Sequence, residues 1–347
     1  MMAVVDPYPS EADARSALEA ACSGLTWRPF GRDDLPAIAD FYAACEAYDH
    51  NPERHSLAAL AEFWDSPRSR PDADTLVGCD SSGIVATAWA GCNRVVIDRR
   101  GVFLGGAVRP DRRGRGIGQA VLRWEMAHGF EWDRATRQVG YGPLVMRLHA
   151  PCDQADIRNL AERHGLAIER YFFELSRRLG DSPLVPEVEG VRLVGWDAAR
   201  SPEVHRVVDE AFQDHWGHTD RTDEMWQEVI GSAAFRPQWS VLAIDGDTGA
   251  VVGAAINCAY EQDWQATGVA EGYTDQLAVT RDYRGRGIAS ALLKESMRRF
   301  AASGMNAAAL GVDAANSSGA LRLYEGLGYQ QTARTCVHQF LRRTAPT

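Results

Sequence analysis

Two glycine-rich loops carry the residues of this chain whose types and spacing suit phosphate chemistry. They follow the pattern Arg-x-x-Gly-x-Gly or its Gly-x-Ala variant, in these residues: Arg113, Gly116, Gly118 and Arg284, Gly287, Ala289. Without large side chains, the backbone N–H groups of such a loop can converge on phosphate oxygens, and a following helix N-terminus adds favourable partial charge. The Walker loop is excluded because no Gly-Lys-Ser/Thr follows, and the glycine spacing excludes the dinucleotide-binding fingerprint.

The loops belong to an internal repeat. From Ala107 to Met126, 11 of 20 positions are identical to the segment that begins at Ala278. The apolar positions after each loop also keep their register, which indicates a core-packed helix in both copies. The repeat therefore predicts two copies of one fold, each with a strand before its loop and a helix after it.

Further elements recur in the same order in both copies. In the second copy we expect strands over 239–244, 251–258, 271–279 and 307–313, a helix from the loop to about Ala302, a helix over 317–327 and a final strand pair. The first copy is expected to have strands over 75–78, 84–97, 102–108 and 144–149 and a helix over 153–164. A strand followed by a helix opens each copy, over 25–30 and 35–47 and over 191–196 and 204–212. The predicted domains are an extension over 1–24 with a short helix after Ser10, a first domain over 25–179, a Pro- and Gly-rich linker over 180–189 and a second domain over 190–347.

Composition limits the possible function classes. A length of 347 residues predicts two domains. The net charge of −10 opposes general attraction to nucleic acid, and no apolar run approaches the ~20 residues of a membrane span, so we expect a soluble cytoplasmic protein. The seven cysteines contain no Cys-x-x-Cys pair, which predicts reduced thiols and no structural zinc. His215-x-x-His218 alone is a weak metal pattern, and we expect no metal.

A second motif follows the second loop, Asp313-Ala-Ala-Asn-Ser-Ser-Gly-Ala-Leu-Arg-Leu-Tyr-Glu-Gly-Leu-Gly-Tyr329. Together with the loops, it resembles the GNAT superfamily of N-acetyltransferases. The resemblance covers about residues 25–178 and 190–343, and the two-copy arrangement is similar to that of mycothiol synthase. It implies an α/β fold (α+β, mixed sheet) of two tandem GNAT acyl-CoA N-acyltransferase domains, with each sheet splayed after its fourth strand.

The resemblance also implies acetyl-CoA as the acyl donor. Its pyrophosphate would lie in the loop and its pantetheine against the strand before it, at the exposed backbone of Leu277 and Val279. The residues expected to contact it are Val108, Arg113, Gly114, Arg115, Gly116, Ile117 and Gly118 in the first copy, and Leu277, Ala278, Val279, Arg284, Gly285, Arg286, Gly287, Ile288, Ala289 and Asn316 in the second.

Acetyl transfer from a thioester to an amine needs a neutral amine and a proton for the departing thiolate. Tyr324 stands where family members place the tyrosine that protonates the thiolate, and a phenol with a pKa near 10 suits that role. Glu271, Tyr273 and Asp275 share one face of their strand by period-two alternation. Glu271 or Asp275, directly or through water, is the expected base.

The first copy lacks these groups. Ala161 aligns with Tyr324, and Arg100, Val102 and Leu104 align with the three residues of the strand. We therefore predict an active C-terminal domain and a non-catalytic N-terminal domain that keeps its cofactor loop.

The acceptor is expected to be a small-molecule amine. The segment from Asp214 to Glu224 holds four acids against one arginine. It could hold a cationic or polar amine, but such charge runs more often form a solvated loop. A non-catalytic acyl-CoA sensor or scaffold, and a longer acyl donor, remain alternatives. No nucleic-acid or membrane partner is expected, and the chain should be a monomer or a homodimer.

Overall fold

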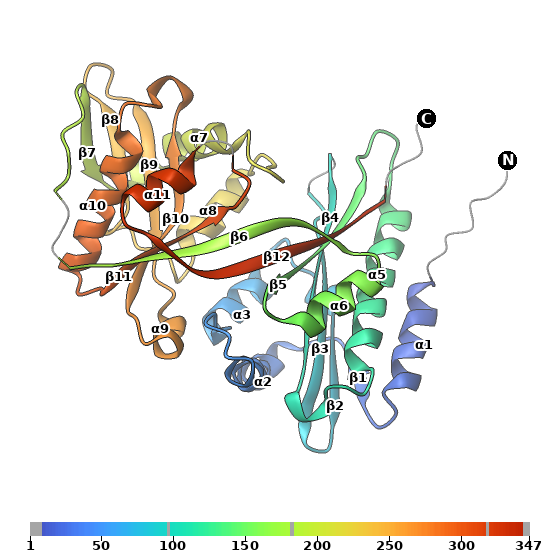
Figure 1. Ribbon diagram of the computed structural model, residues 1–347. Coiled ribbons are helices and arrows are strands. Elements are labelled where there is room, and N and C mark those ends of the chain that lie inside the picture. Colours follow the sequence, from blue (N-terminus) through green and yellow to red (C-terminus); the bar gives the residue numbers. More distant parts are fainter. Residues whose placement is uncertain (1–8, 96–97, 181–183, 317–318, 343–347) are drawn as a thin grey trace. The chain divides into compact units, whose positions relative to one another are not determined.

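The computed structural model describes residues 9–95, 98–180, 184–316 and 319–342, and it divides into two compact units. Unit 1 comprises Met1–Arg170 and Thr335–Thr347, and unit 2 comprises Tyr171–Arg334 (Figure 1). Part of the predicted linker, 181–183, lies outside the described residues. No helix among the described residues is long and apolar enough to cross a membrane.

Unit 1 contains a six-stranded sheet with the order β1-β2-β3-β4-β5-β12. Its strands are β1 (Thr26–Arg28), β2 (Thr75–Asp80), β3 (Gly83–Cys92), β4 (Arg100–Val108), β5 (Leu144–Pro151) and β12 (Gln330–Arg342). The β4–β5 pair is parallel, and the other pairs are antiparallel. The first loop therefore follows β4, one of the two strands of the parallel pair.

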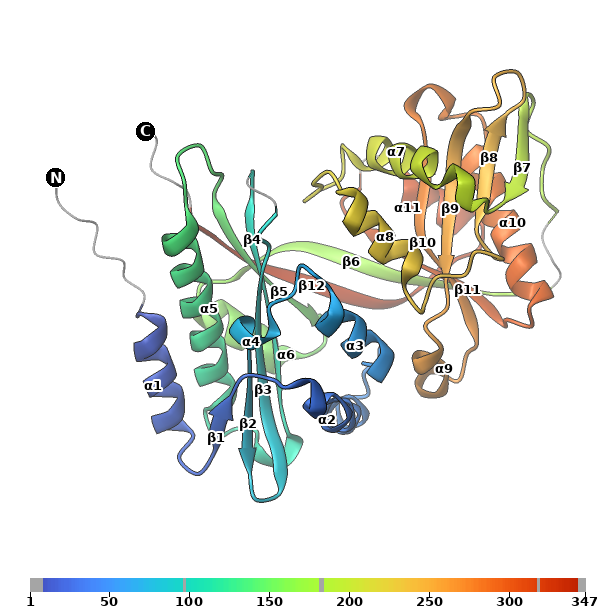
Figure 2. The same ribbon diagram turned by 180° about the vertical axis from the view of Figure 1, so that it is seen from behind.

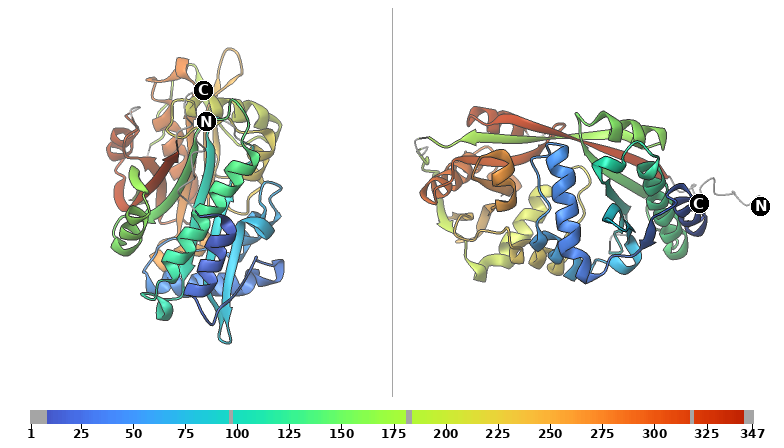
Figure 3. Two further views of the ribbon diagram at one scale, coloured as in Figure 1. Left: turned by 90° about the vertical axis from the view of Figure 1, so that its right-hand side faces the viewer. Right: turned by 90° about the horizontal axis from the view of Figure 1, so that it is seen from below.

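Helices cover both faces of this sheet. They are α1 (Glu11–Ala21), α2 (Leu35–Tyr48), α3 (Leu57–Asp65), α4 (Pro71–Asp74), α5 (Ile117–Thr136) and α6 (Ala155–Arg163), with short 3₁₀ turns at Arg32–Asp34 and Pro110–Arg112. Leu76 packs with α1 and α5, whereas the next residue, Val77, packs with α2. Figure 2 shows α1 and α5 on one side of this sheet and α2 on the other. The period-two alternation of the strand thus divides the core into two layers. The helix expected after Ser10 is confirmed as α1, which lies along α5 (Figure 3).

Unit 2 repeats this plan with the strand order β6-β11-β10-β9-β8-β7. The strands are β6 (Ala167–Arg178), β7 (Val191–Gly195), β8 (Val241–Asp245), β9 (Val251–Cys258), β10 (Glu271–Val279) and β11 (Ala307–Asp313). The helices are α7 (Ser201–Phe212), α8 (Asp223–Gly231), α9 (Glu261–Thr267), α10 (Ile288–Ala302) and α11 (Ala320–Gly326), with 3₁₀ turns at Ala198–Arg200 and Arg281–Tyr283. The bounds expected for β9, β10 and β11 are confirmed.

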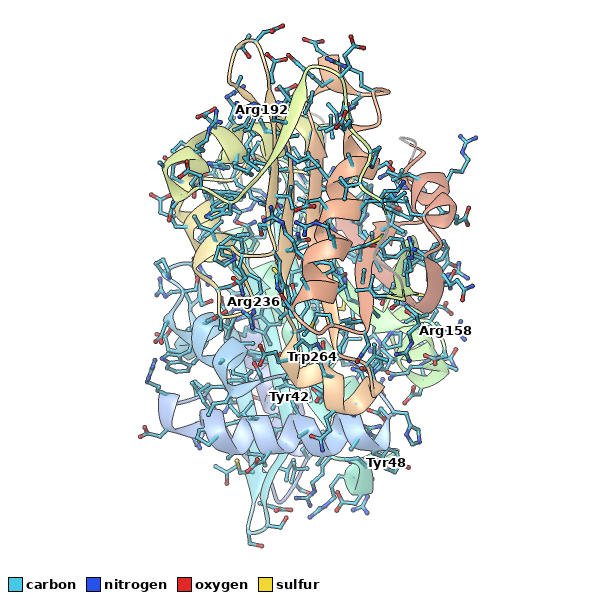
Figure 4. The ribbon with its side chains drawn as sticks, turned by 90° about the vertical axis from the view of Figure 1, so that its left-hand side faces the viewer. Tyr42, Tyr48, Arg158, Arg192, Arg236 and Trp264 are labelled. Carbon is cyan, nitrogen blue, oxygen red and sulfur yellow. A yellow bond between two sulfur atoms is a disulfide. The ribbon has the colours of Figure 1, made fainter. Side chains whose placement is uncertain are left out.

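Opposite faces of the unit 2 sheet pack against different helices. Val241 packs under α10, whereas Leu242 packs under α7 and α8. The helix α9 carries Trp264 (Figure 4) and was not expected from the sequence. It is tied to the segment before β8 by Arg236, whose Nη2 lies 2.6 Å from Oε1 of Glu261.

Each unit contains a strand that the repeat assigns to the other copy. The residues of β6 from Phe172 to Arg178 pair with β11 of unit 2, and those of β12 from Thr335 to Arg342 pair with β5 of unit 1. The compact units thus divide the chain at other places than the repeat does. The boundaries at 179 and 190 stay a prediction.

The cysteines correct one expectation. Cys152 and Cys336 form a disulfide with a Cα–Cα distance of 5.3 Å, although 184 residues separate them. The cause is the exchanged strand, because β12 places Cys336 opposite Ala150, two residues before Cys152. The remaining cysteines carry free thiols, as expected: Cys22, Cys45, Cys79, Cys92 and Cys258.

Candidate active site

Both glycine-rich loops form an open turn at the start of a long helix. Gly285 and Gly287 have φ angles of 77° and 83°, and Gly114 and Gly116 have 73° and 84°, in the left-handed region that glycine adopts without strain. Apart from the adjacent residues, no atom of the described residues would lie within 4 Å of a β-carbon on any of the four. A helix leaves its first N–H groups without an intrahelical acceptor. These amides and the open space above them therefore fit a pyrophosphate group.

The arginine side chains tie the loops to their surroundings. In unit 2, Arg284 donates from Nε to the carbonyl of Val279 and from Nη2 to that of Ala211, both at 3.2 Å. In unit 1, Arg113 donates from Nε to the carbonyl of Val108 at 2.8 Å and pairs with Asp49, with 2.8 Å between Nη2 and Oδ2. The guanidinium groups thus hold the loop in place, and the loop backbone is left to face a ligand.

The other arginines of the loops also bond to backbone carbonyls. Arg286 donates from Nη2 to the carbonyl of Glu189 at 3.0 Å, and Arg115 donates to that of Asp111 at 3.2 Å. A β-carbon at Gly118 would make ordinary contacts of 3.8 Å, which explains why Ala289 can stand at this place in unit 2. The roles of all these residues in cofactor binding stay predictions.

The sheet opens beside each loop. In unit 2, β10 pairs with β11 only from Glu271 to Tyr273. In unit 1, β4 pairs with β5 from Arg100 to Leu104. Beyond these points, β10 and β4 keep a strand partner on one side only among the described residues, so each unit has an edge of unpaired backbone next to its loop.

The backbone of β10 directs alternate residues toward this edge. Thr280 donates its N–H to the carbonyl of Val252 on β9. By alternation, Ala278 also turns its backbone groups toward β9, whereas Leu277 and Val279 turn theirs toward the open edge. These two residues thus offer N–H and C=O groups that fit the amides of pantetheine. Ala278 has its side chain in the core and its backbone paired.

A β-bulge at Asp275 shapes the middle of β10. Thr274 lies opposite Asn257 and Gln276 lies opposite Ile256, so Asp275 has no partner on β9. Before the bulge, the even-numbered residues face α10. The hydroxyl of Thr274 donates to Oδ1 of Asn257 at 2.8 Å, and Nδ2 of Asn257 donates to Ser296 of α10 at 2.9 Å. After it, the even-numbered residues face α7. The bulge therefore turns Asp275 and Gln276 toward the same face as Glu271 and Tyr273.

This bulge corrects the alignment of the two copies. Within the described residues, β4 pairs with β3 without interruption from Val102 to Val108. Phe103 therefore corresponds to Tyr273, Gly101 corresponds to Glu271, and Asp275 has no counterpart. The expected match of Arg100, Val102 and Leu104 with the three β10 residues is wrong by one place, because an extra residue in β10 shifts the register.

Asp275 is held by uncharged groups. Its Oδ1 accepts from the hydroxyl of Tyr260 at 3.4 Å, and its Oδ2 accepts from Nε2 of Gln276 at 3.2 Å. Gln276 in turn accepts from Nη1 of Arg221 at 3.3 Å. Desolvation by the surrounding protein raises the pKa of Asp275 above its ordinary value, although the residue is exposed to solvent. A carboxylate in this state is a stronger proton acceptor than an ordinary one.

The strand β6 adds two polar residues to this face. The hydroxyl of Ser176 donates to Oε2 of Glu271 at 3.2 Å, and the hydroxyl of Tyr273 donates to Oε2 of Glu174 at 3.0 Å. Burial raises the pKa of Glu271. Gly311 lies beneath the second pair, since a β-carbon there would be 2.8 Å from the Tyr273 hydroxyl. Glu174 and Ser176 were not predicted, because the sequence repeat assigns β6 to the other copy.

Tyr324 approaches from the opposite face. It packs in the cluster that contains Leu310 of β11 and Phe300 of α10. A β-carbon on Gly272 would also meet Phe300, so its neighbours Glu271 and Tyr273 point away from α10 and from Tyr324. Burial raises the pKa of Tyr324 to about 12, and its phenol therefore keeps its proton at neutral pH. The phenol of Tyr324 and the acids of β10 thus lie on opposite faces of the sheet.

Apart from Arg221, the remaining segments predicted for the site lie outside the group of side chains around β10. Asn316 lies in the turn after β11, and residues 317–318, where the next helix was expected to begin, lie outside the described residues. Asp214 pairs with Arg281 at 2.9 Å on the surface, and Nε2 of His218 lies 3.2 Å from Asp220. Arg221 reaches β10 through Gln276. The unpredicted helices α3 and α8 had a local signal, since Ser56 and Thr222 cap their first turns.

The sequence of this chain is similar to those of known acetyltransferases. The sequence model of the acetyltransferase (GNAT) family matches residues 199–329. The mycothiol acetyltransferase of Mycolicibacterium vanbaalenii is 30% identical over 236 residues, which are 64% of this chain and 69% of the relative. That of Thermomonospora curvata is 30% identical over 244 residues, which are 67% of this chain and 71% of the relative. Both stretches are longer than the part that the family model covers.

Solved structures are similar over both units. A GCN5-related N-acetyltransferase from Sphaerobacter thermophilus has a TM-score of 0.73 at 24% identity, covering 93% of this chain and 98% of that one. A tandem GNAT protein from the clavulanic acid biosynthesis pathway has a TM-score of 0.66 at 16% identity, covering 93% of this chain and all of the other. At these identities the likeness concerns the fold, and the fold class implied by the family resemblance is confirmed.

Proposed function

Since this chain belongs to the GNAT family of acetyltransferases, we propose that it transfers an acetyl group from acetyl-CoA to the amine of a small polar molecule, with unit 2 as the catalytic unit. The relatives named mycothiol acetyltransferase support a small-molecule acceptor. The observation that carries the proposal is that the acids of β10 and Tyr324 lie on opposite faces of the same sheet.

The donor site is assigned to the second loop and the open edge of β10. Acetyl-CoA supplies the activated acetyl group and a thiol as the leaving group. The amides that follow Arg284 would hold the pyrophosphate, and the backbone of Leu277 and Val279 would hold the pantetheine. The open space at Gly285 and Gly287 supports this assignment.

The acceptor needs a base, because an alkylammonium group has a pKa near 10 and is protonated at neutral pH. Asp275 is our first candidate, since its raised pKa and its position on the bulge leave a carboxylate oriented by Tyr260 and Gln276. The rings of Tyr260 and Tyr273 meet edge to face at 5.2 Å. Aromatic faces beside a carboxylate attract a cation, so the same residues suit an incoming ammonium group.

Tyr324 is proposed to return a proton to the thiolate. Its phenol is protonated at neutral pH, and it comes from the helix that follows β11. Unit 1 keeps the loop and the open edge but has Ala161, Gly101 and Phe103 at the corresponding places. We propose that unit 1 can bind the cofactor but does not catalyse the transfer. In terms of the repeat, the non-catalytic domain would be 25–179 and the catalytic domain 190–347.

The proposed role of Tyr324 is tested by comparing turnover in two variants, Tyr324→Phe and Tyr329→Phe. Tyr324→Phe should lower kcat by about 10²- to 10⁴-fold and leave the acceptor KM nearly unchanged, because proton donation matters only as the thiolate departs. Tyr329→Phe is the matched control. Its ring centroid lies 6.0 Å from that of Tyr324, and its buried hydroxyl has no hydrogen-bond partner among the described residues, so its loss should leave turnover intact. Release of free thiol with a panel of amines measures both.

Two outcomes would contradict the proposal. Equal activity of Tyr324→Phe and the wild type would exclude Tyr324 as the acid. Turnover that survives Tyr324→Phe but disappears in a folded Gly116→Glu protein would assign catalysis to unit 1 instead.

A further inference from the structure

Unit 1 contains a cavity of about 330 Å³ on the face of its sheet that corresponds to the acceptor side in unit 2. A volume of this size is typical of small-molecule sites. The end of α3, the loop after it, β3 and β4 form its walls. Six lining residues carry the argument: Phe63, Trp89, Phe103, Arg68, Arg70 and Arg94. Phe103 is the counterpart of Tyr273, so the two units present the same place with different side chains.

One side of the cavity is flat and apolar. The indole ring of Trp89 lies along the sheet over two glycines, because a β-carbon would come within 2.5 Å of this ring at Gly91 and within 3.2 Å at Gly105. Phe63 meets the ring edge to face, with the centroids 5.4 Å apart. The glycines thus make room for an aromatic surface that a planar group can stack against.

The charge of the cavity is opposite to that of its counterpart. Three arginines and one acid, Asp74, line it, in a chain with a net charge of −10. Asp74 is buried and holds Arg94 with two hydrogen bonds of 2.7 Å, which fixes that guanidinium at the wall. Arg68 and Arg70 stand on the loop after α3. In unit 2 the corresponding face carries acids instead, among them Asp275 and Glu174.

We propose that this cavity binds a small organic anion, a carboxylate or a phosphate monoester joined to a flat apolar group. Arg68 and Arg70 would bind the anionic head in the paired geometry that guanidinium groups form with carboxylates and phosphates. Trp89 and Phe103 would contact the apolar part. This site is separate from the catalytic residues of unit 2 and does not depend on their assignment.

Calorimetry with defined probes tests the proposal on the full chain. We expect 3-phenylpropionate, phenyl phosphate or both to bind at least tenfold more tightly than the neutral 3-phenylpropanamide, and the cation 2-phenylethylamine not to bind this site. The double variant Arg68→Gln/Arg70→Gln should weaken binding of the anion at least tenfold. Arg163→Gln removes one positive charge, half the change in the double variant, from an exposed position on α6 and should change little. The relative affinity of the two anions identifies the head group.

Three results would overturn the inference. They are equal binding of the anions and the amide, undiminished binding to a folded double variant, and an equal loss in Arg163→Gln. The second would place the anion elsewhere, for example at a glycine-rich loop. Because the readout is binding to unit 1, a failure of this proposal leaves the proposed acetyl transfer in unit 2 untouched, and the reverse also holds.

Discussion

The sharpest test of the catalytic assignment is Asp275→Asn. The amide has the shape of the carboxylate and keeps one oxygen that can accept from Tyr260 or Gln276, which now contact Asp275 at 3.4 and 3.2 Å. What disappears is the ability to take a proton from the acceptor. General base catalysis typically contributes about 10²- to 10⁴-fold, or about 3 to 5 kcal/mol of activation free energy. We expect kcat/KM to fall within this range.

The pH profile distinguishes loss of the base from loss of structure. Desolvation raises the pKa of Asp275, so the wild-type kcat/KM should fall on acidification at a pH above the ordinary carboxyl range. That acid limb should be absent in Asp275→Asn. An acid whose pKa is raised by folding binds its proton more tightly in the native state, so its stabilising effect is lost as the pH rises through the folded pKa. The Asn variant should therefore be at least as stable as the wild type at neutral pH.

The assay is free-thiol release across the pH range, with urea unfolding of each variant. Glu271→Gln is the informative comparison, since Glu271 lies on the same face and burial also raises its pKa. Asp247→Asn, at the exposed hairpin between β8 and β9, controls for the change of charge. Wild-type kcat/KM with an unchanged acid limb in Asp275→Asn would refute the reasoning. A lost limb in Glu271→Gln alone would transfer the role to that residue.

Three further predictions follow from other parts of the structure. Gly287→Glu should abolish turnover and weaken cofactor binding to unit 2, measured by calorimetry, since a side chain there strains a φ of 83° and fills the open turn. The equivalent Gly116→Glu should lower only the cofactor stoichiometry. Unchanged cofactor binding in a folded Gly287→Glu protein would show that the pyrophosphate does not bind at this loop. Burial raises the pKa of Glu125 on α5 from 4.5 to about 8, so at about 1.4 kcal/mol per pKa unit the wild type should lose about 5 kcal/mol of unfolding free energy between these pH values. Urea unfolding of Glu125→Gln should lack this dependence, and a flat wild-type profile would contradict it. Cys336→Ser should lower the unfolding free energy by about 2 to 5 kcal/mol under oxidising conditions and have no effect in excess reductant, whereas equal stability in both conditions would mean that the disulfide adds nothing.

The repeat and the loops could be predicted from the sequence because each has a local cause, and the fold class followed from the family resemblance that their residues carry. A left-handed turn at the start of a helix requires residues such as Gly285 and Gly287, and a helix that packs on a sheet repeats its apolar residues with a helical period. The strands β9 and β11 had predictable bounds because they are mostly apolar runs. The end of β10 was predictable because the glycine-rich loop follows it. The sequence also predicted that Tyr324 and the acids of β10 belong to the second copy, because they stand in the motifs that surround the second loop.

Only the tertiary structure decided how these residues meet. A bulge depends on hydrogen bonds to a neighbouring strand, so the extra residue at Asp275, which displaces the register of the two copies, leaves no mark in a single sequence. The exchange of β6 and β12 is a matter of strand pairing between segments far apart in the chain. It brings Glu174 to Tyr273 and Cys336 to Cys152, contacts that local periodicity cannot encode. Local preferences thus determined which elements form, and long-range pairing determined which side chains share the site.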